Sequence, residues 1–189
     1  MLFRSLKACD GLDGLKDRLI QDPRKCKFDP KVLTCKAADA PDCLTAAEVA
    51  TVRKMYQPAR NVRRGKAVSP AYTPGNELGW AALLGGPEPN NLGMDQFRFV
   101  VFKDEKWDWR TFDFDKDIER TIQADDGQTD ARNPDIKPFL AHNGKLLLYH
   151  GWSDQLVPTE TTISYYEDVA KKMGGVSKID QQVRMFLAP

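Results

Sequence analysis

A strand–helix–strand pattern in the last third of the chain is the feature that most restricts the fold. The run GKLLLYHG (144–151) is short and apolar, as expected for a buried strand. Residues 159–173 then predict a helix with one apolar face, which a Gly-Gly pair ends, and QVRMFLAP (182–189) predicts a second strand. Two strands joined by a helix form a parallel pair, so the sequence predicts an α/β fold with a parallel sheet.

Asp154 lies just past the first of these strands, in GWSDQLVP. Functional side chains in parallel α/β sheets gather at the carboxyl ends of the strands. An α/β-hydrolase carries its catalytic acid there, in the chain order Ser, Asp, His, where the acid fixes the tautomer of the histidine and stabilises its imidazolium form. A carboxylate at this place can equally cap the turn or the helix after it. The spacing alone leaves both interpretations open.

The partners of such an acid are missing from the 189 residues. None of the five serines lies in a G-x-S-x-G nucleophile elbow. His142 and His150 both precede Asp154, whereas the histidine of this arrangement follows the next strand. We therefore expect that this chain cannot assemble a Ser-His-Asp triad by itself.

The four cysteines all lie in the first quarter of the chain, at Cys9, Cys26, Cys35 and Cys43. None forms a C-x-x-C motif and neither histidine is near them, so a zinc site has little support. Their clustering in a loop-rich stretch favours disulfides, and an oxidising compartment, over free buried thiols. Three pairings remain possible on this ground.

The segment CDGLDGLKDRL offers oxygen ligands of the kind that Ca²⁺ prefers. Asp10, Asp13 and Asp17 provide carboxylates, and the backbone carbonyls of Leu15 and Leu19 lie between and beyond them. The segment does not match the EF-hand pattern. Its alternative is the acidic face of a helix, since these aspartates have helical spacing, although the two glycines between them disfavour a helix.

Composition excludes several classes of function. The chain has 28 Lys and Arg against 27 Asp and Glu, a net charge of +1, which gives no electrostatic footprint for nucleic acid or an anionic membrane. No apolar run approaches the roughly 18 residues that span a bilayer. The segment MLFRSLKACDG is too polar for a signal peptide. We expect a loop-rich protein without nucleic-acid or membrane partners.

Three further segments predict local structure. Thr45 and Glu48 fit a capping box, which predicts a helix over the apolar positions that follow. QFRFVVF (96–102) is interpreted as a strand or short buried run. WDWRTFDFDKDIERTI is expected to become helical near Asp115.

Several of these segments, in the same order, resemble the tannase and feruloyl esterase family. They are CDGLDGLKDRLIQDPRKCKFDP, CLTAAEVATVRKMY, WDWRTFDFDKDIER and GKLLLYHGWSDQLVPTETTISYYEDVAKKMGG. The resemblance runs from about Cys9 to Pro189. It implies part of an α/β-hydrolase core (135–189) and a large, disulfide-tied lid domain (1–134). It also implies a carboxylic ester hydrolase acting on small aromatic esters, of hydroxycinnamic, gallic or, in one type, terephthalic acid.

The resemblance assigns roles residue by residue. Asp154 matches the family's catalytic acid. The family's serine, in Gly-Cys-Ser-x-Gly, would precede Met1, and its histidine, in Gly-x-x-His-Cys, would follow Pro189. We therefore expect an internal fragment that is inactive alone, from a secreted or periplasmic enzyme whose signal peptide is not in this chain.

The lid residues gain assignments in the same way. The resemblance implies disulfides Cys9–Cys26 and Cys35–Cys43. It also implies a structural Ca²⁺ held by five residues, Asp10, Asp13, Leu15, Asp17 and Leu19. Five aromatic residues are candidates to border a planar phenolic acid or, more simply, to pack in the interior: Trp80, Phe97, Phe99, Trp107 and Trp109.

A different class of function also fits the residues. Without its own serine and histidine, the chain is alternatively a non-catalytic, calcium-stabilised binding module, a lid separated from its core. The retained segment around Asp154 opposes this alternative, because a binding module has no use for a catalytic acid.

Overall fold

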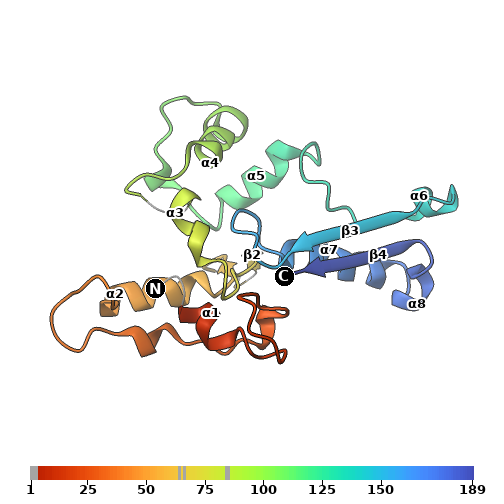
Figure 1. Ribbon diagram of the computed structural model, residues 1–189. Coiled ribbons are helices and arrows are strands. Elements are labelled where there is room, and N and C mark those ends of the chain that lie inside the picture. Colours follow the sequence, from red (N-terminus) through yellow and green to blue (C-terminus); the bar gives the residue numbers. More distant parts are fainter. Residues whose placement is uncertain (1–3, 64, 66, 84–85) are drawn as a thin grey trace.

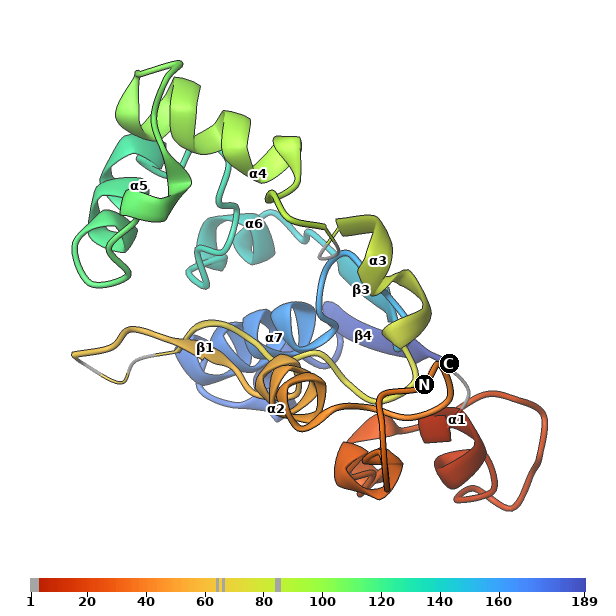
Figure 2. The same ribbon diagram turned by 90° about the vertical axis from the view of Figure 1, so that its left-hand side faces the viewer.

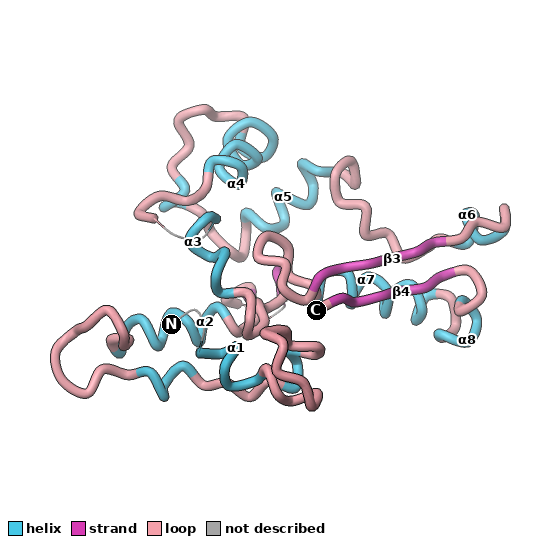
Figure 3. Tube along the Cα trace, in the orientation of Figure 1, coloured by secondary structure: helices cyan, strands magenta, loops and turns pink. Residues whose placement is uncertain are grey.

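The computed structural model describes residues 4–63, 65, 67–83 and 86–189, and the residues outside these ranges all fall in the predicted lid. Long loops connect short helices and strands (Figure 3). The α-helices are α1 (Arg4–Cys9), α2 (Ala46–Met55), α3 (Trp80–Leu83), α4 (Asn91–Asp95), α5 (Asp117–Asp125), α6 (Lys137–Ala141), α7 (Glu160–Lys172) and α8 (Val176–Ile179). The strands are β1 (Ala59–Arg60), β2 (Ala67–Ser69), β3 (Leu146–Gly151) and β4 (Val183–Ala188).

The predicted strand–helix–strand unit is confirmed as β3, α7 and β4. The two strands pair in parallel, from Leu146 opposite Val183 to Gly151 opposite Ala188. Helix α7 runs beside them (Figure 1). The carboxyl ends of both strands therefore meet at one edge, and the turn after β3 lies at that edge.

The Gly-Gly pair ends α7 as predicted. Gly174 and Gly175 have φ angles of +93° and +116°, which glycine adopts without a steric penalty. The Gly175 N–H donates to the carbonyl of Ala170 at 2.8 Å, and the Gly174 N–H to the carbonyl of Lys171 at 3.3 Å. These two bonds form a Schellman motif, which satisfies carbonyls that the helix end leaves free.

The main apolar core lies where α7 and α8 cover one face of the strands. Val169, Ile179 and Val183 are at most 1% exposed there. The opposite face of the strands is open: Leu147, Tyr149 and Phe186 are 63%, 83% and 59% exposed. The alternation follows from the pleat, because neighbouring residues of a strand point to opposite faces.

Both predicted disulfides, Cys9–Cys26 and Cys35–Cys43, are present. The first has a small apolar cluster around it, in which Ile20 is buried. Closing loops of this length limits the conformational entropy of the unfolded chain, and it holds together a region with little regular structure.

The predicted capping box is confirmed at the start of α2. The Glu48 N–H donates to Thr45 Oγ1 at 3.2 Å, and the Thr45 N–H donates to Glu48 Oε2 at 2.8 Å. Val49 and Val52 on this helix are buried.

The expected strand or buried run at 96–102 is wrong. These residues form a π-helix, Gln96–Phe102, that continues from α4. Phe97 and Phe102 both face one aromatic cluster, in which Phe102 stacks on Trp107 at 4.5 Å and Phe97 meets Phe112 at 5.0 Å between ring centroids. Residues five apart lie on opposite faces of a strand but on one side of a π-helix, so the aromatic cluster favours the helix.

Two groups of helices lie on opposite sides of the molecule. Figures 1 and 2 show α4 and α5 on one side and α1 and α2 on the other. The segment between α2 and α4 contacts the turn after β3. Over the described ranges, no helix is long and apolar enough to cross a membrane.

Replacing Ile179 by alanine should destabilise the fold. Its side chain is 1% exposed between α7 and the strands, so Ile179→Ala should lower the free energy of unfolding by about 2–5 kcal/mol. Val176 lies on the same helix but is 52% exposed, so Val176→Ala should change it by less than about 0.5 kcal/mol. Urea unfolding measures both, and equal losses would contradict the assignment of this core.

Candidate active site

Asp154 lies in the turn that joins β3 to α7, residues 152–159, which we call the acid turn. Its Oδ1 accepts hydrogen bonds from the backbone N–H groups of Leu156 (2.8 Å) and Val157 (2.9 Å). Its Oδ2 lies 3.2 Å from Nε2 of His150. The carboxylate is about one third exposed, so it is held by the turn and still open to a further partner.

The strand and helix on either side fix the acid turn. The Trp152 N–H donates to the carbonyl of Ala188 at 2.6 Å, which extends the pairing with β4 by one residue. Thr159, buried at the start of α7, donates its hydroxyl to the carbonyl of Gly151 at 2.7 Å. The main chain therefore enters and leaves the turn at fixed points, and Asp154 lies between them.

The charge state of Asp154 follows from these contacts. Burial raises the pKa of its carboxyl, but the N–H groups of Val157 and Leu156 and the imidazole of His150 outweigh burial and lower the pKa below its ordinary value. The charge of Asp154 acts in turn on Tyr72, whose hydroxyl pKa is raised by burial and then by this carboxylate. The acid is therefore ionised at neutral pH, as a triad acid must be.

A segment of the predicted lid, residues 72–80, packs against the acid turn, and we call it the clamp segment. Asn76 is 2% exposed and donates its side-chain N–H to the carbonyl of Asp154 at 3.2 Å, while its Oδ1 accepts from Trp80 Nε1 at 3.0 Å. A Cβ on Gly79 would lie 2.5 Å from Cβ of Gln155, so only glycine permits this approach.

Glu77 anchors the clamp segment to two helices. Its carboxylate is 3% exposed and accepts hydrogen bonds from Ser5 Oγ on α1 (2.9 Å), from the Tyr56 hydroxyl at the end of α2, and from the Gly75 N–H. Burial, followed by the charge of Glu77, raises the pKa of the Tyr56 hydroxyl, which therefore stays a donor. Three donors, one of which (the Gly75 N–H) is shared between both oxygens, satisfy a carboxylate that would otherwise be costly to bury.

The loop between Cys9 and Cys26 also reaches the acid turn. The guanidinium of Arg24 lies over the ring of Trp152, 4.9 Å from its centroid, and pairs with Asp22 at 2.9 Å. Trp152 is buried and is the first residue of the acid turn. The disulfide-closed loop is thus in direct contact with the residues that position the acid.

His150 is a site residue that the spacing did not predict as a partner of Asp154. His150 lies in β3, and Asp154 follows the end of that strand, four residues later. Because side chains alternate between the two faces of a strand, His150 points to the face toward α7. Asn76 was missed as well, because nothing in a sequence marks an asparagine that bonds a carbonyl 78 positions away.

The predicted calcium residues lie on a loop of turns after α1 and do not form an acidic helix face. Each carboxylate binds a backbone N–H through Oδ1: Asp13 binds Leu15 (2.9 Å), Asp17 binds Leu19 (3.1 Å), and Asp10 reaches Arg18 (2.7 Å).

Within the described ranges, no three Asp, Glu, His or Cys side chains converge into a metal-binding group. The predicted ligands are carboxylate and carbonyl oxygens on one short loop, which is the ligand type that Ca²⁺ prefers. The structure does not bring the three carboxylates together.

The aromatic candidates separate into different environments. Phe97 and Trp107 belong to the aromatic cluster of the π-helix, and Trp109 donates its Nε1–H to Glu88 at 2.8 Å. Phe99 is 57% exposed. Trp80 lies nearest to the acid turn, since it bonds Asn76 and meets the ring of Tyr56 at 5.7 Å between centroids.

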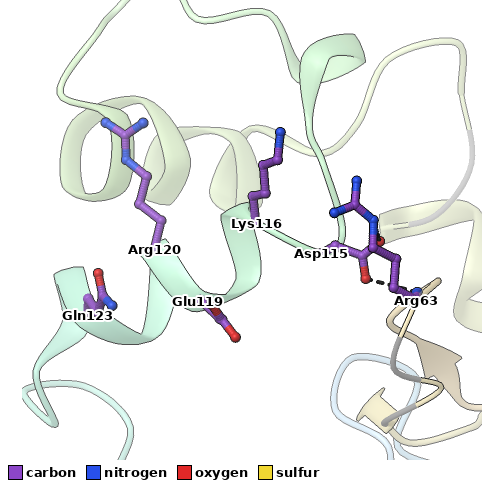
Figure 4. A pocket seen from close by; sticks show the side chains of 6 residues that line it. All are labelled: Arg63, Asp115, Lys116, Glu119, Arg120 and Gln123. Carbon is purple, nitrogen blue, oxygen red and sulfur yellow. Dashed lines mark hydrogen bonds and ion pairs between the residues drawn. The ribbon is translucent and has the colours of Figure 1, made fainter.

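A polar cavity of about 420 Å³ opens beside α5, lined by Arg63, Asp115, Lys116, Glu119, Arg120 and Gln123 (Figure 4). The guanidinium of Arg63 pairs with Asp115 at 3.3 Å. The lining includes neither Asp154 nor a predicted calcium ligand, so this cavity is separate from the candidate site.

The parallel strands, the crossing helix and the acid at the strand end define a fold of the α/β-hydrolase type. The sequence matches the family described as "Tannase and feruloyl esterase" over residues 3–189, and the chain belongs to that family. The predicted resemblance is thereby confirmed.

Individual relatives agree with the family. The probable feruloyl esterase B-2 of Aspergillus terreus is 33% identical over 183 residues, which cover 96% of this chain and 34% of that protein. An uncharacterised esterase of Xanthomonas campestris pv. campestris is 31% identical over 214 residues, covering 98% and 37%. The chain thus spans about a third of the length of the curated relatives it matches.

Solved structures are similar over the same region. Feruloyl esterase B from Aspergillus oryzae superposes with a TM-score of 0.89 at 32% identity, covering 97% of this chain and 37% of that one. Tannin acyl hydrolase from Aspergillus niger superposes with a TM-score of 0.79 at 19% identity, covering 98% and 39%, and shows the shared fold alone.

The lowered pKa of Asp154 predicts a pH-dependent stabilisation. Its folded-state pKa lies below an unfolded value of about 4, so the carboxylate stabilises the fold above that pH and loses this effect as the pH falls through the folded-state pKa. Asp154→Asn should therefore lower the free energy of unfolding at pH 7 and matter less at about pH 2.5. Urea unfolding at both pH values measures this, and equal losses would contradict it.

Proposed function

We propose that this chain supplies the catalytic acid, Asp154, of a serine carboxylic ester hydrolase that cleaves small esters of aromatic acids, such as hydroxycinnamic or gallic acid. The observation that carries the proposal is the ionised carboxylate, about one third exposed, that two backbone N–H groups hold at the carboxyl end of β3. Membership of the tannase and feruloyl esterase family supports the reaction type and the aromatic class of substrate.

The serine and the histidine of the triad come, in this proposal, from polypeptide outside the 189 residues. The histidine takes the proton of the serine hydroxyl as Oγ attacks the ester carbonyl, and it returns that proton to the leaving alcohol. Water then hydrolyses the acyl-enzyme in the same way. Asp154 accepts the other imidazole N–H throughout, which fixes the tautomer and stabilises the imidazolium.

Residues 1–134 act as the lid in this proposal. The contacts of Asn76 and Gly79 with the acid turn support it, since they join the predicted lid directly to the catalytic acid. The two disulfides support an oxidising destination, secreted or periplasmic.

The proposal includes a Ca²⁺ ion with a structural role. Asp10, Asp13 and Asp17, with the carbonyls of Leu15 and Leu19, would hold the ion on the loop that Cys9–Cys26 closes. Calcium takes no part in the chemistry; its effect is to stabilise a loop that contacts the acid turn through Arg24.

Replacing Asp154 by asparagine tests the catalytic role. In the polypeptide of the complete reading frame, Asp154→Asn should reduce kcat for methyl ferulate or methyl gallate by about 10⁴-fold, because an amide favours the wrong histidine tautomer. Circular dichroism should show an unchanged fold.

Asp168→Asn, at an exposed carboxylate of α7, is the matched control and should leave kcat unchanged. Activity that survives Asp154→Asn would refute the assignment of the acid. A complete reading frame with no esterase activity would favour a calcium-stabilised binding module instead.

Removing calcium ligands tests the metal proposal. Ca²⁺ at about 100 times its Kd should raise the free energy of unfolding by about 2.7 kcal/mol, and Mg²⁺ should do less because it prefers a tight octahedral site. Asp13→Asn and Asp17→Asn should abolish the effect, as measured by calorimetric unfolding with and without chelator.

Asp42→Asn, in the loop of the other disulfide, is the control and should retain the calcium effect. Stabilisation that is unchanged in Asp13→Asn would place the ion elsewhere.

A further inference from the structure

His150 is positioned by contacts with three separate parts of the acid turn and α7. Its side chain is 11% exposed. Nε2 lies 3.2 Å from Asp154 Oδ2 and 3.2 Å from the carbonyl oxygen of Val157, and Nδ1 lies 2.6 Å from Thr162 Oγ1 on the first turn of α7. Both ring nitrogens are therefore engaged.

The partners determine which nitrogen carries the proton. A carboxylate and a carbonyl only accept hydrogen bonds, so Nε2, which faces both, must be the donor. The hydroxyl of Thr162 can donate, and in a neutral imidazole it donates to Nδ1. The surroundings thus select the Nε2–H tautomer of His150.

The acceptor sites of Asp154 can be counted in the same way. An ionised carboxylate has about four lone-pair positions, two on each oxygen. Leu156 and Val157 fill those of Oδ1, and His150 takes one of Oδ2. Within the described ranges no other hydrogen bond reaches Oδ2, so one position on this oxygen remains.

We propose that His150 is a positioning residue for the catalytic acid: its Nε2–H fixes Oδ2 of Asp154 so that the last acceptor position of this oxygen receives the N–H of the triad histidine. The Thr162 hydroxyl acts one step further back by holding the imidazole of His150 in the required tautomer. His150 itself does not contact the substrate. This inference rests on the proposed role of Asp154.

Two substitutions separate positioning from packing. In the polypeptide of the complete reading frame, His150→Leu removes the donor, and kcat should fall about 10- to 100-fold, the effect of one hydrogen bond to a charged group, with KM within about twofold. His150→Gln keeps a side-chain N–H at a similar reach and should recover most of kcat.

His142→Leu is the matched control, because His142 follows α6 at the other end of β3. It should leave kcat unchanged. Equal losses in His150→Leu and His150→Gln, accompanied by equal losses in thermal stability, would overturn positioning in favour of packing. No loss in His150→Leu would overturn it outright.

A spectroscopic readout tests the same geometry without activity. Histidine ring ¹⁵N shifts, recorded where the ring of His150 is neutral, should show its Nε2–H tautomer, and Thr162→Val should shift the Nδ1 resonance. A neutral His150 ring that carries its proton on Nδ1 instead of Nε2 would overturn the inference.

The outcomes also separate this inference from the function it rests on. If Asp154→Asn abolishes turnover while His150→Leu does not, the catalytic role of Asp154 stands and the positioning role of His150 falls. If Asp154→Asn retains turnover, the proposed function itself fails, whatever the ring shifts of His150 show.

Discussion

The hydrogen bonds from Leu156 and Val157 to one oxygen of Asp154 are the interaction on which the site depends. They form only if the main chain turns back immediately after β3, and this turn is fixed by the parallel pairing of β3 with β4 before it and by α7 after it. The same bonds keep the carboxyl ionised although it is partly buried. Fold, turn and charge state are thus consequences of one arrangement.

The predicted lid contributes to this arrangement from the other side. Asn76 bonds the carbonyl of Asp154, and the buried carboxylate of Glu77 ties the same segment to α1 and α2. Arg24, from the loop that the first disulfide closes, covers Trp152. The loop-rich region therefore supports the acid turn through Asn76 and Arg24. The proposed calcium ion would act on the proposed catalytic acid through the same contacts.

Features set by local chemistry could be predicted from the sequence. The capping box at Thr45, the glycines that end α7, the βαβ unit and the position of Asp154 all depend on residues close together in the chain, and the disulfide pairing followed from the family resemblance. The π-helix at 96–102 and the contacts of Asn76 could not be predicted, because they depend on partners brought together by the fold. The sequence shows His150 close to Asp154, but the tautomer of its imidazole depends on the contact with Thr162, which only the fold provides. The calcium loop and the domain boundary at 134/135 stay predictions.

The most direct test of the central claim is a crystal structure of the polypeptide from the complete reading frame, with its serine trapped by an aryl phosphonate. The measured quantity is the distance from Asp154 Oδ2 to the nearest imidazole nitrogen contributed from outside these 189 residues. The account predicts a hydrogen bond of about 2.7–3.2 Å to that nitrogen, with His150 still bound to the same oxygen. A carboxylate of Asp154 that has no imidazole partner except His150 would contradict it.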